Sequence, residues 1–258
     1  MVSLSDDELT RYARQIILKE IGGAGQMRLK GATVLLIGAG GIGAPAIPYL
    51  AGAGIGRLIL VDDDRVDLSN LQRQTLYDVT QVGQPKVDAA AAFVAARNPH
   101  VAVETQRLRI DAATAPALVA RADVVIDGSD NFDTRLAVAD AALALRVPLV
   151  SAAVGQFEGQ LAVYRGWEPG RPCYRCFVGD TPDDAALSCA DAGILGPVTG
   201  MIGSLAALEA IRAVAPFGED PTGTLLIADL LAARYRTLRL PKDPGCRACG
   251  PSSLAVTD

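Results

Sequence analysis

Apolar residues along this chain of 258 residues come in short unbroken runs, which are separated by longer alanine-rich segments. Short apolar runs without alternation are typical of strands that are buried on both faces of a parallel sheet. The pattern predicts strands at residues 33–37, 58–61, 101–108, 123–127 and 148–153, and helices at residues 44–53, 87–97, 114–121 and 132–146. The alternation of strands and helices predicts an α/β fold with a mainly parallel central sheet.

The second half of the chain shows a different pattern. Residues 159–164 alternate between apolar and polar side chains, which favours an antiparallel strand, and further strands are expected at 224–228 and 235–240. Residues 194–214 are apolar but contain glycine, proline and two charged residues, so we expect a buried helix and no membrane span. At the other end, Ser5 and Glu8 form a capping box that predicts an N-terminal helix.

The strongest chemical signal lies between the first predicted strand and the first predicted helix. Gly38, Gly40 and Gly43 have the spacing G-x-G-x-x-G, which permits a tight turn, a close approach of backbone to phosphate, and close packing of helix on strand. The following helix presents free N–H groups to an anion, and Asp62 ends the next strand, where an acid can bind ribose hydroxyls. Glycines alone would indicate only a turn, but in this setting they predict a nucleotide site.

Polar residues also follow the predicted strands at their carboxyl ends, the edge at which open α/β sheets bind ligands. Arg73 can donate two hydrogen bonds to a phosphate, although without this location it would be read as a surface charge. Lys86 begins a helix, where the helix dipole disfavours a cation, and so indicates a nearby anion. Asp130 could bind magnesium, or Ser129 or Asp130 could simply cap the next helix.

Five cysteines carry a second signal. Cys173 and Cys176 form one C-x-x-C pair, and Cys246 and Cys249 form another much later in the chain. Brought together, the two pairs would make a closed tetrahedral Cys₄ site, which favours structural zinc over a redox pair. Cys189 lies near the end of an acidic and polar segment at 178–190 that we expect to be a mobile loop; it could be a nucleophile or a small buried residue.

Composition excludes several functional classes. The net charge of −5 gives no electrostatic case for nucleic-acid binding, and a single histidine excludes a catalytic histidine pair. The first residues show no basic segment followed by an apolar one, so we expect no signal peptide, no membrane partner and a cytoplasmic location.

Six motifs then occur in order: R-Y-x-R-Q at 11–15, G-x-G-G-I-G at 38–43, S-N-L-Q-R-Q at 69–74, V-G-Q-P-K at 82–86, D-x-S-D-N at 127–131, and P-C-Y-R-C at 172–176 with the later C-x-x-C. In this combination the sequence resembles the MoeB/ThiF/HesA group of adenylyltransferases, relatives of the ubiquitin-activating enzymes, and in particular their molybdopterin-synthase adenylyltransferase type. The resemblance implies one Rossmann-like domain over residues 1–258, with a mixed sheet and bound zinc (Zn²⁺). Its parts would be an N-terminal helical segment (1–30), a nucleotide-binding half (31–150) and a carrier-protein and zinc half (151–258).

The resemblance also implies an activity. Such enzymes use ATP and Mg²⁺ to adenylylate the C-terminal Gly-Gly carboxylate of a small ubiquitin-like sulfur-carrier protein, for sulfur transfer in molybdopterin or thiamine-type cofactor biosynthesis. They are usually homodimers, in which Arg14 would reach the partner's γ-phosphate. Asp62 would hold the ribose, Gly41 would approach the α-phosphate, and Asp130 would bind magnesium. The other nucleotide contacts implied by the motifs are Gly38, Gly40, Gly43, Ser69, Asn70, Leu71, Gln72, Arg73, Gln74, Lys86 and Asn131.

Some points stay open at this level. Cys189 aligns with a cysteine that bonds the carrier in thiamine-pathway relatives and is dispensable in molybdopterin-type relatives. Pro45 and Pro48 depart from the family pattern, and we expect Pro48 to bend its helix. The chain ends soon after Cys249, without room for a rhodanese domain, so a separate sulfur donor is expected. The alternatives are an NAD-dependent oxidoreductase, a non-catalytic ATP-binding scaffold, and a family member with a different substrate.

Overall fold

A computed structural model describes residues 3–180 and 193–250. Cys189 and most of the loop expected at 178–190 lie outside these residues. The described chain forms one eight-stranded sheet in the order β3-β2-β1-β4-β5-β6-β7-β8. The strands are β1 (Thr33–Ile37), β2 (Arg57–Val61), β3 (Ala102–Gln106), β4 (Val124–Asp127), β5 (Leu149–Gly155), β6 (Glu158–Tyr164), β7 (Thr224–Asp229) and β8 (Arg234–Arg239).

The sheet is mixed in the way that the sequence predicts. Strands β1 to β5 pair in parallel, and β6, β7 and β8 extend the sheet as an antiparallel unit. Ile37, at the end of β1, pairs with Val61 of β2 on one side and Asp127 of β4 on the other. The chain runs outward from β1 through β2 to β3 and then returns to β4 on the opposite side of β1. This reversal of strand order is the place where α/β sheets of this kind bind ligands.

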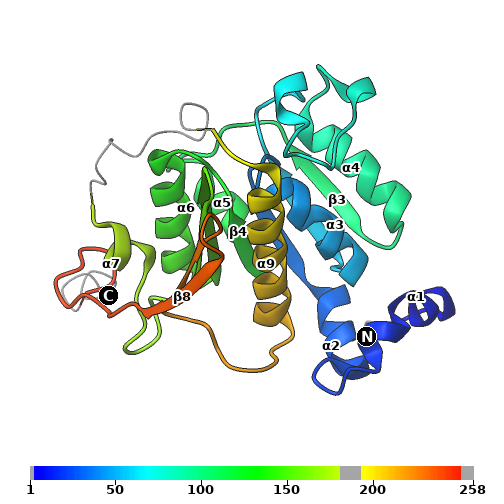
Figure 1. Cartoon of the computed structure of the whole chain (residues 1–258). Coiled ribbons are helices and arrows are strands. Elements are labelled where there is room, and N and C mark those ends of the chain that lie inside the picture. Colours follow the sequence, from blue (N-terminus) through cyan, green and yellow to red (C-terminus); the bar gives the residue numbers. More distant parts are fainter. Residues whose placement is uncertain (1–2, 181–192, 251–258) are drawn as a thin grey trace.

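Helices cover both faces of the parallel sheet (Figure 1). They are α1 (Asp6–Ile16), α2 (Gly22–Gly31), α3 (Gly43–Ala53), α4 (Lys86–Arg97), α5 (Ala115–Val119), α6 (Phe132–Leu145), α7 (Tyr174–Val178) and α9 (Gly196–Val214), with short 3₁₀ turns η1 (Leu68–Asn70) and η2 (Val79–Gln81). Helices α3, α4 and α9 pack on one face, and α5 and α6 pack on the other. Successive β1 residues therefore enter different cores, Leu36 on the first face and Leu35 on the second, which explains the unbroken apolar run.

Helix α9 is the one helix among the described residues that is long and apolar enough to cross a membrane. It lies against α3 and against strands β4, β5 and β6, and Ile202, Ala206 and Ala210 on it are fully buried. It is therefore the core helix that the sequence predicts. A Cβ on Gly203 would lie 2.4 Å from both the Ile42 carbonyl oxygen and the Pro45 ring, so glycine is required where α9 crosses the start of α3.

The two prolines near the start of α3 do not interrupt it. The helix runs from Gly43 to Ala53 with Pro48 inside it, and the Pro45 ring forms part of the contact with α9. Pro48 has no N–H to donate to the residue one turn earlier. The bend expected at Pro48 stays a prediction.

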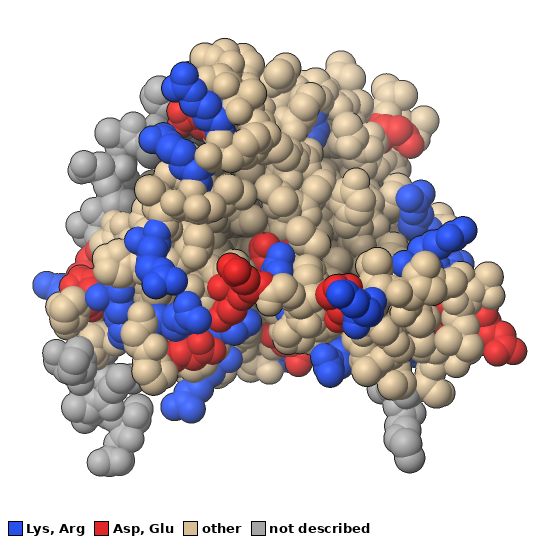
Figure 2. Space-filling model, turned by 60° about the horizontal axis from the view of Figure 1, so that its bottom comes forward, with Lys and Arg blue, Asp and Glu red and all other residues tan. Residues whose placement is uncertain are grey.

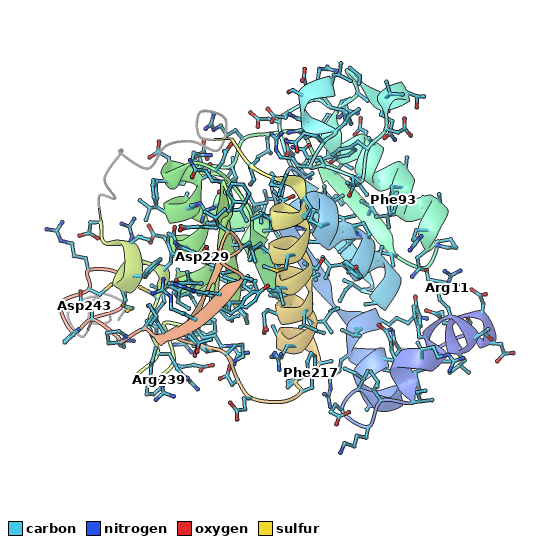
Figure 3. The ribbon with its side chains drawn as sticks, viewed as in Figure 1. Arg11, Phe93, Phe217, Asp229, Arg239 and Asp243 are labelled. Atoms are coloured by element: carbon cyan, nitrogen blue, oxygen red, sulfur yellow. The ribbon has the colours of Figure 1, made fainter. Side chains whose placement is uncertain are left out.

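The N-terminal segment forms two helices held against the main body. The predicted capping box at Ser5 is present, with the Glu8 carboxylate accepting a hydrogen bond from the Ser5 amide at 2.8 Å. The Tyr12 hydroxyl accepts from the Asn98 side chain at 2.8 Å, and the Gln15 amide donates to the Ala53 carbonyl oxygen at 3.2 Å. Two residues of the R-Y-x-R-Q motif are thus anchors. Figure 3 shows Arg11 of this motif on α1, together with Phe217 near the far end of α9.

Surface charge agrees with the small net charge. On the face shown in Figure 2, lysine and arginine side chains are interspersed with aspartate and glutamate, so the two signs neutralise each other locally. Such a surface does not form the broad basic field that nucleic acids require.

Candidate active site

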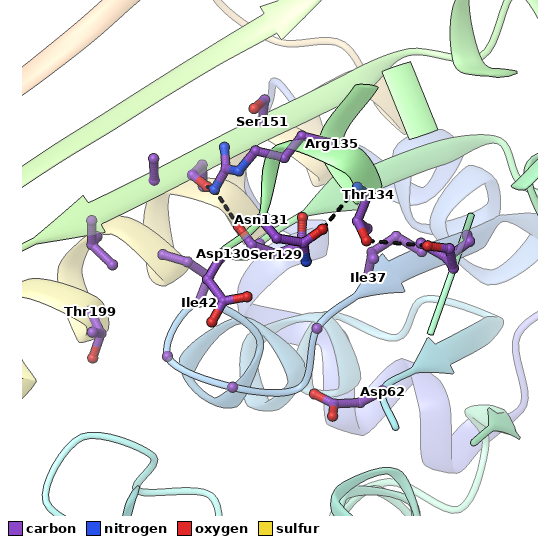
Figure 4. A pocket seen from close by; sticks show the side chains of 18 of the residues that line it. Ile37, Ile42, Asp62, Ser129, Asp130, Asn131, Thr134, Arg135, Ser151 and Thr199 are labelled. Atoms are coloured by element: carbon purple, nitrogen blue, oxygen red, sulfur yellow. Dashed lines mark hydrogen bonds between the residues drawn. The ribbon is translucent and has the colours of Figure 1, made fainter. Parts of the chain in front are cut away.

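A pocket of about 820 Å³ opens at the carboxyl edge of the parallel strands. Its walls come from the loop between β1 and α3, the end of β2, the segment after η1, and the turn between β4 and α6 (Figure 4). It continues past the ends of β5 and β6 to Tyr164 and Tyr174. The pocket therefore lies at the predicted edge, and its volume suits a nucleotide-sized ligand.

The glycine loop is held by hydrogen bonds to both backbone polar groups of Ala39. The Ala39 amide donates to the Asp62 carboxylate at 2.7 Å, and the Ala39 carbonyl oxygen accepts from the buried Tyr77 hydroxyl at 2.8 Å. Gly38 has a φ of 84°, in the left-handed region that favours glycine. A Cβ on Gly43 would lie 2.1 Å from the Gly38 carbonyl oxygen, so no other residue fits there.

This fixed loop leaves hydrogen-bond donors free for a ligand. Gly40 and Gly41 line the pocket, and within the described chain no acceptor is recorded for the amides of Gly40, Gly41 and Ile42. Helix α3 begins at the next residue without a side-chain cap. Unpaired N–H groups together with the positive end of the helix dipole make an anion-binding site.

Asp62 lies where the sequence predicts a ribose ligand. Its carboxylate accepts from the Asp64 amide at 2.8 Å as well as from Ala39, and it lines the pocket. Burial raises the pKa of Asp62 above its usual value, against the opposing effect of the Lys86 ammonium. The carboxylate is thus held in one orientation and keeps acceptor capacity for ligand hydroxyls.

Two cations also reach the pocket. Lys86 is buried at the start of α4, and its Nζ lies 2.6 Å from a carboxylate oxygen of Asp64. Arg73 is half-buried and donates through Nη1 to the Ser69 carbonyl oxygen at 3.1 Å. The structure thus brings both predicted cations to the pocket wall.

The turn between β4 and α6 supplies the carboxylate of Asp130. The Asp127 carboxylate is buried and accepts from the Ser129 amide at 3.0 Å and from the Ser129 hydroxyl at 2.7 Å. The Asn131 side chain caps α6 by accepting from the Thr134 amide at 2.9 Å. The expectation that Ser129 or Asp130 caps this helix is therefore wrong, because the cap lies one residue later. Asp130 is exposed; among the described residues its carboxylate accepts no hydrogen bond, and it lies near enough to Arg135 to interact with the guanidinium charge.

Arg135 is a buried cation that sequence reasoning missed. Its guanidinium donates to the Ser129 carbonyl oxygen and, at 2.9 Å, to the Ala152 carbonyl oxygen of β5. Burial opposes its charge, but the nearby Asp127 carboxylate and Tyr174 hydroxyl raise the pKa of Arg135. The sequence contains a signal for it: Arg135 lies in the first turn of a helix, where the dipole disfavours a cation, the same signal that identified Lys86.

Sequence reasoning also missed one residue behind the glycine loop, Tyr77, and one pocket residue, Thr199. Tyr77 fixes the glycine loop, and Thr199 at the start of α9 would lie 3.2 Å from a Cβ on Gly41, so it sets the space over that glycine. Tyr77 follows the S-N-L-Q-R-Q motif closely, but nothing in the sequence relates Thr199 to the glycine loop.

Other predicted residues take different positions. Asn70, Gln74 and Asn131 line the pocket, whereas Gly43, Ser69, Leu71 and Gln72 do not. Gln74 is buried, and its side-chain oxygen is left without a partner in the described chain. Arg14 is exposed on α1 and is not a pocket residue. Cys189 lies outside the described residues.

The two cysteine pairs meet at one place, as predicted. The Sγ atom of Cys173 lies 3.8 Å from that of Cys176 and 3.6 Å from that of Cys246, and the Sγ atoms of Cys176 and Cys249 are 3.4 Å apart. Four sulfurs around a tetrahedral zinc ion with bonds of about 2.3 Å would be about 3.8 Å apart, so the cluster fits zinc. Burial raises the pKa of Cys249 to about 11, so a bound cation would be needed to favour the thiolate.

The arrangement suits one kind of ligand. Free amides, Arg73 and Lys86 offer positive charge to phosphates, Asp62 offers acceptors to hydroxyls, and Asp130 offers an oxygen ligand to a hard cation. The pocket lining can therefore hold a nucleoside polyphosphate with its metal ion.

Comparisons with known proteins point the same way. A model of the ThiF family matches residues 12–248. The chain is 43% identical over 250 residues to the molybdopterin-synthase adenylyltransferase of Escherichia coli, covering 97% of this chain and 100% of that protein. It is 45% identical over 259 residues to a sulfur carrier protein adenylyltransferase of Thermus thermophilus, covering 98% of this chain and 95% of that protein. A crystal structure of E. coli MccB with MccA-N7isoASN has a TM-score of 0.82 at 24% identity, covering 93% of this chain and 75% of that one, which shows a shared fold.

Proposed function

The chain belongs to the ThiF family, and we propose that it uses ATP to adenylylate the C-terminal carboxylate of a ubiquitin-like sulfur-carrier protein and releases pyrophosphate. The single observation that carries this proposal is the convergence of Arg73, Lys86, Asp62 and Asp130 on one pocket beside the glycine loop. The relatives are named as adenylyltransferases, which leaves no support for the NAD-dependent oxidoreductase alternative.

In this proposal each polar group of the pocket has one task. The free amides of Gly40 and Gly41 bind the α-phosphate, and Asp62 accepts hydrogen bonds from the ribose. Arg73 and Lys86 bind the β- and γ-phosphates, for which Lys86 exchanges its ion pair with Asp64 for phosphate oxygens. Asp130 holds a magnesium ion, which supplies charge neutralisation on the phosphate oxygens when it is bound.

The reaction brings together groups of the same charge. The carrier carboxylate attacks the α-phosphorus of ATP, an acyl-phosphate bond forms, and the bond to the leaving pyrophosphate breaks. Since no covalent enzyme intermediate is required, the protein contributes positioning and positive charge. The buried Lys86 ammonium is worth more than an exposed one, because the surrounding protein screens it less than water would.

The carrier tail enters from the side of β5 and β6. The pocket extends beyond the nucleotide groups to Ala153, Gln160 and Tyr174, which leaves a passage for an extended peptide with small residues. A C-terminal Gly-Gly has no side chains, so it fits such a passage at little steric cost.

Arg14 gives a reason to propose a homodimer. It is exposed, lies outside the pocket, and has no recorded partner in the described part of the chain. Tyr12 and Gln15 hold its helix in place, so Arg14 is presented outward on a fixed support. In a twofold dimer such a side chain can reach the γ-phosphate in the partner's pocket.

The cysteine cluster is proposed to hold structural Zn²⁺, and the protein to work in the cytoplasm. Four thiols arranged for a metal suit a reducing compartment. Among the described residues no thiol lines the pocket, so sulfur for the activated carboxylate is proposed to come from a separate donor.

Mass spectrometry tests the function directly. Candidate carriers of the molybdopterin and thiamine pathways are incubated with the protein, ATP and Mg²⁺, and we expect one of them to gain the mass of AMP. In this assay Asp130→Ala should fold but transfer no AMP. A wild-type protein whose melting temperature rises with NAD and not with Mg-ATP would contradict the proposal.

A further inference from the structure

The turn at residues 128–131, between β4 and α6, has no regular secondary structure of its own, yet it carries the carboxylate proposed to bind magnesium. Three side chains hold this turn: Asp127 binds the Ser129 amide and hydroxyl, Asn131 binds the Thr134 amide, and Arg135 binds the Ser129 carbonyl oxygen. Asp130 takes no part in these bonds and stays available to a ligand. The turn is therefore oriented by its neighbours.

Arg135 fixes the peptide unit that directly precedes Asp130. Its guanidinium bonds the carbonyl oxygen of the Ser129–Asp130 peptide and, through the same nitrogen, the Ala152 carbonyl oxygen of β5. Figure 4 shows Arg135 extending across the turn beside Ser129 and Asp130. One side chain thus ties the turn after β4 to the neighbouring strand, and only a long donor with several N–H groups can do so.

The Arg135 guanidinium also has a neighbour in the segment that carries the first two cysteines of the cluster. Tyr174, which lies between Cys173 and Cys176 in the sequence, lies close enough to Arg135 for its hydroxyl to interact with the guanidinium charge, and its ring packs edge-on against Tyr164 at 5.6 Å between centroids. Tyr174 is buried at 5% exposure. The segment that carries two of the cysteines therefore also limits where Arg135 can point.

We infer that Arg135 is a positioning residue of the adenylylation site: its guanidinium fixes the Ser129–Asp130 peptide and thereby aims the Asp130 carboxylate at the metal ion of the bound nucleotide. This inference rests on the proposed function for its metal and nucleotide, but the orientation of the turn is a property of the free protein. Residues that orient a metal ligand through a hydrogen bond change metal affinity by about 10- to 100-fold when they are replaced.

The test uses Arg135→Gln and, because a buried cation is removed, the charge-conserving Arg135→Lys. Arg212→Gln is the matched control, since Arg212 also donates to backbone carbonyls and lies partly buried on α9, outside the pocket. Hydrogen exchange is followed in the protein without magnesium or nucleotide, for peptides containing residues 128–131. We expect faster exchange at 128–131 in Arg135→Gln, and no change there in Arg212→Gln.

The second measurement is binding of Mn²⁺ together with a non-hydrolysable ATP analogue, followed by the electron paramagnetic resonance of free Mn²⁺. We expect the Mn²⁺ dissociation constant to rise about 10-fold or more in Arg135→Gln and to stay near wild type in Arg212→Gln. Should Arg135→Gln not fold, Arg135→Lys is read by the same two measurements. An unchanged Mn²⁺ affinity in a folded Arg135 variant, or faster exchange spread evenly over β4 and α6, would overturn the inference. A wild-type protein that binds Mn²⁺ and nucleotide but transfers no AMP would refute the proposed function alone.

Discussion

Two ion pairs in this protein, each with one buried member, predict opposite results for the same substitution. In the pocket, the Lys86 side chain is 5% exposed and its partner Asp64 is 67% exposed. Between α2 and α1, the roles are reversed: the Lys30 side chain is 28% exposed, and that of its partner Glu8 is 2% exposed. Replacing either lysine by methionine keeps the length of the side chain and removes one charge, so the exposure of the remaining carboxylate decides the cost to folding.

Lys86→Met should lower activity and leave stability nearly unchanged. The Asp64 carboxylate can regain water, so we expect a change in unfolding free energy within about 1 kcal/mol. A cation at about 4 Å from a phosphate charge contributes at most about 4 kcal/mol at an effective dielectric constant of about 20. We therefore expect a loss of about 2–4 kcal/mol of transition-state stabilisation, so that kcat/KM for AMP transfer falls about 30- to 1,000-fold.

Lys30→Met should lower stability and leave AMP transfer nearly unchanged. Glu8 keeps its bond to the Ser5 amide but loses the Lys30 ammonium while its side chain stays buried, so we expect a loss of about 1–3 kcal/mol in unfolding free energy. Burial acts to raise the pKa of Glu8, but Lys30 and Ser5 bring it below its usual 4.5. This stabilisation is present above pH 4.5 and is lost as the pH falls through the lowered pKa, so the two proteins should converge in acid.

The assays are AMP transfer to the carrier per folded molecule and urea unfolding, each applied to both variants. We expect Lys30→Met to transfer AMP at the wild-type rate when it is folded. If Lys86→Met transferred AMP normally, the ammonium would have no role in binding phosphate. If both variants lost the same stability, the exposure of the partner carboxylate would not be the deciding quantity.

Three other substitutions follow from the same geometry. Gly43→Ala should abolish the rise in melting temperature that ATP and Mg²⁺ produce, because its Cβ would collide with the Gly38 carbonyl oxygen; a normal rise would show that the loop can shift. Cys246→Ser should lower the zinc content measured by inductively coupled plasma mass spectrometry from one ion per chain and lower the melting temperature. Arg14→Ala and Lys86→Met should each transfer AMP much more slowly than wild type, but their mixture should regain AMP transfer through mixed dimers that hold one intact site; a mixture that exchanges subunits and regains nothing would show that Arg14 does not act in the partner's pocket.

Much of the fold could be predicted because local pattern and global position agree. The unbroken apolar run of β1 reflects burial on both faces, and the glycine spacing at 38–43 is dictated by contacts as close as that between Gly43 and Gly38. Helix α2 could be foreseen only as part of a helical segment, because its glycines leave little apolar periodicity.

The site was harder to predict where similar residues lie next to each other. Ser129, Asp130 and Asn131 can each cap a helix, and only the backbone geometry assigns the cap to Asn131. Arg135 donates to one carbonyl oxygen in the turn before α6 and to another in β5, which follows α6, and no local pattern reports such a contact. The role proposed for Arg14 depends on a second copy of the chain, about which one sequence gives no contact information.

The cysteine cluster sets the order in which parts of the newly synthesised chain can fold. Strands β1 to β5 are complete once residue 155 has left the ribosome, but Cys173 and Cys176 must wait for Cys246 and Cys249 before the four sulfurs can meet. The nucleotide end of the pocket can therefore assemble while synthesis continues, whereas Tyr174 settles only after translation has passed residue 249. The end of the pocket that Tyr174 lines would thus be completed in one late step of folding.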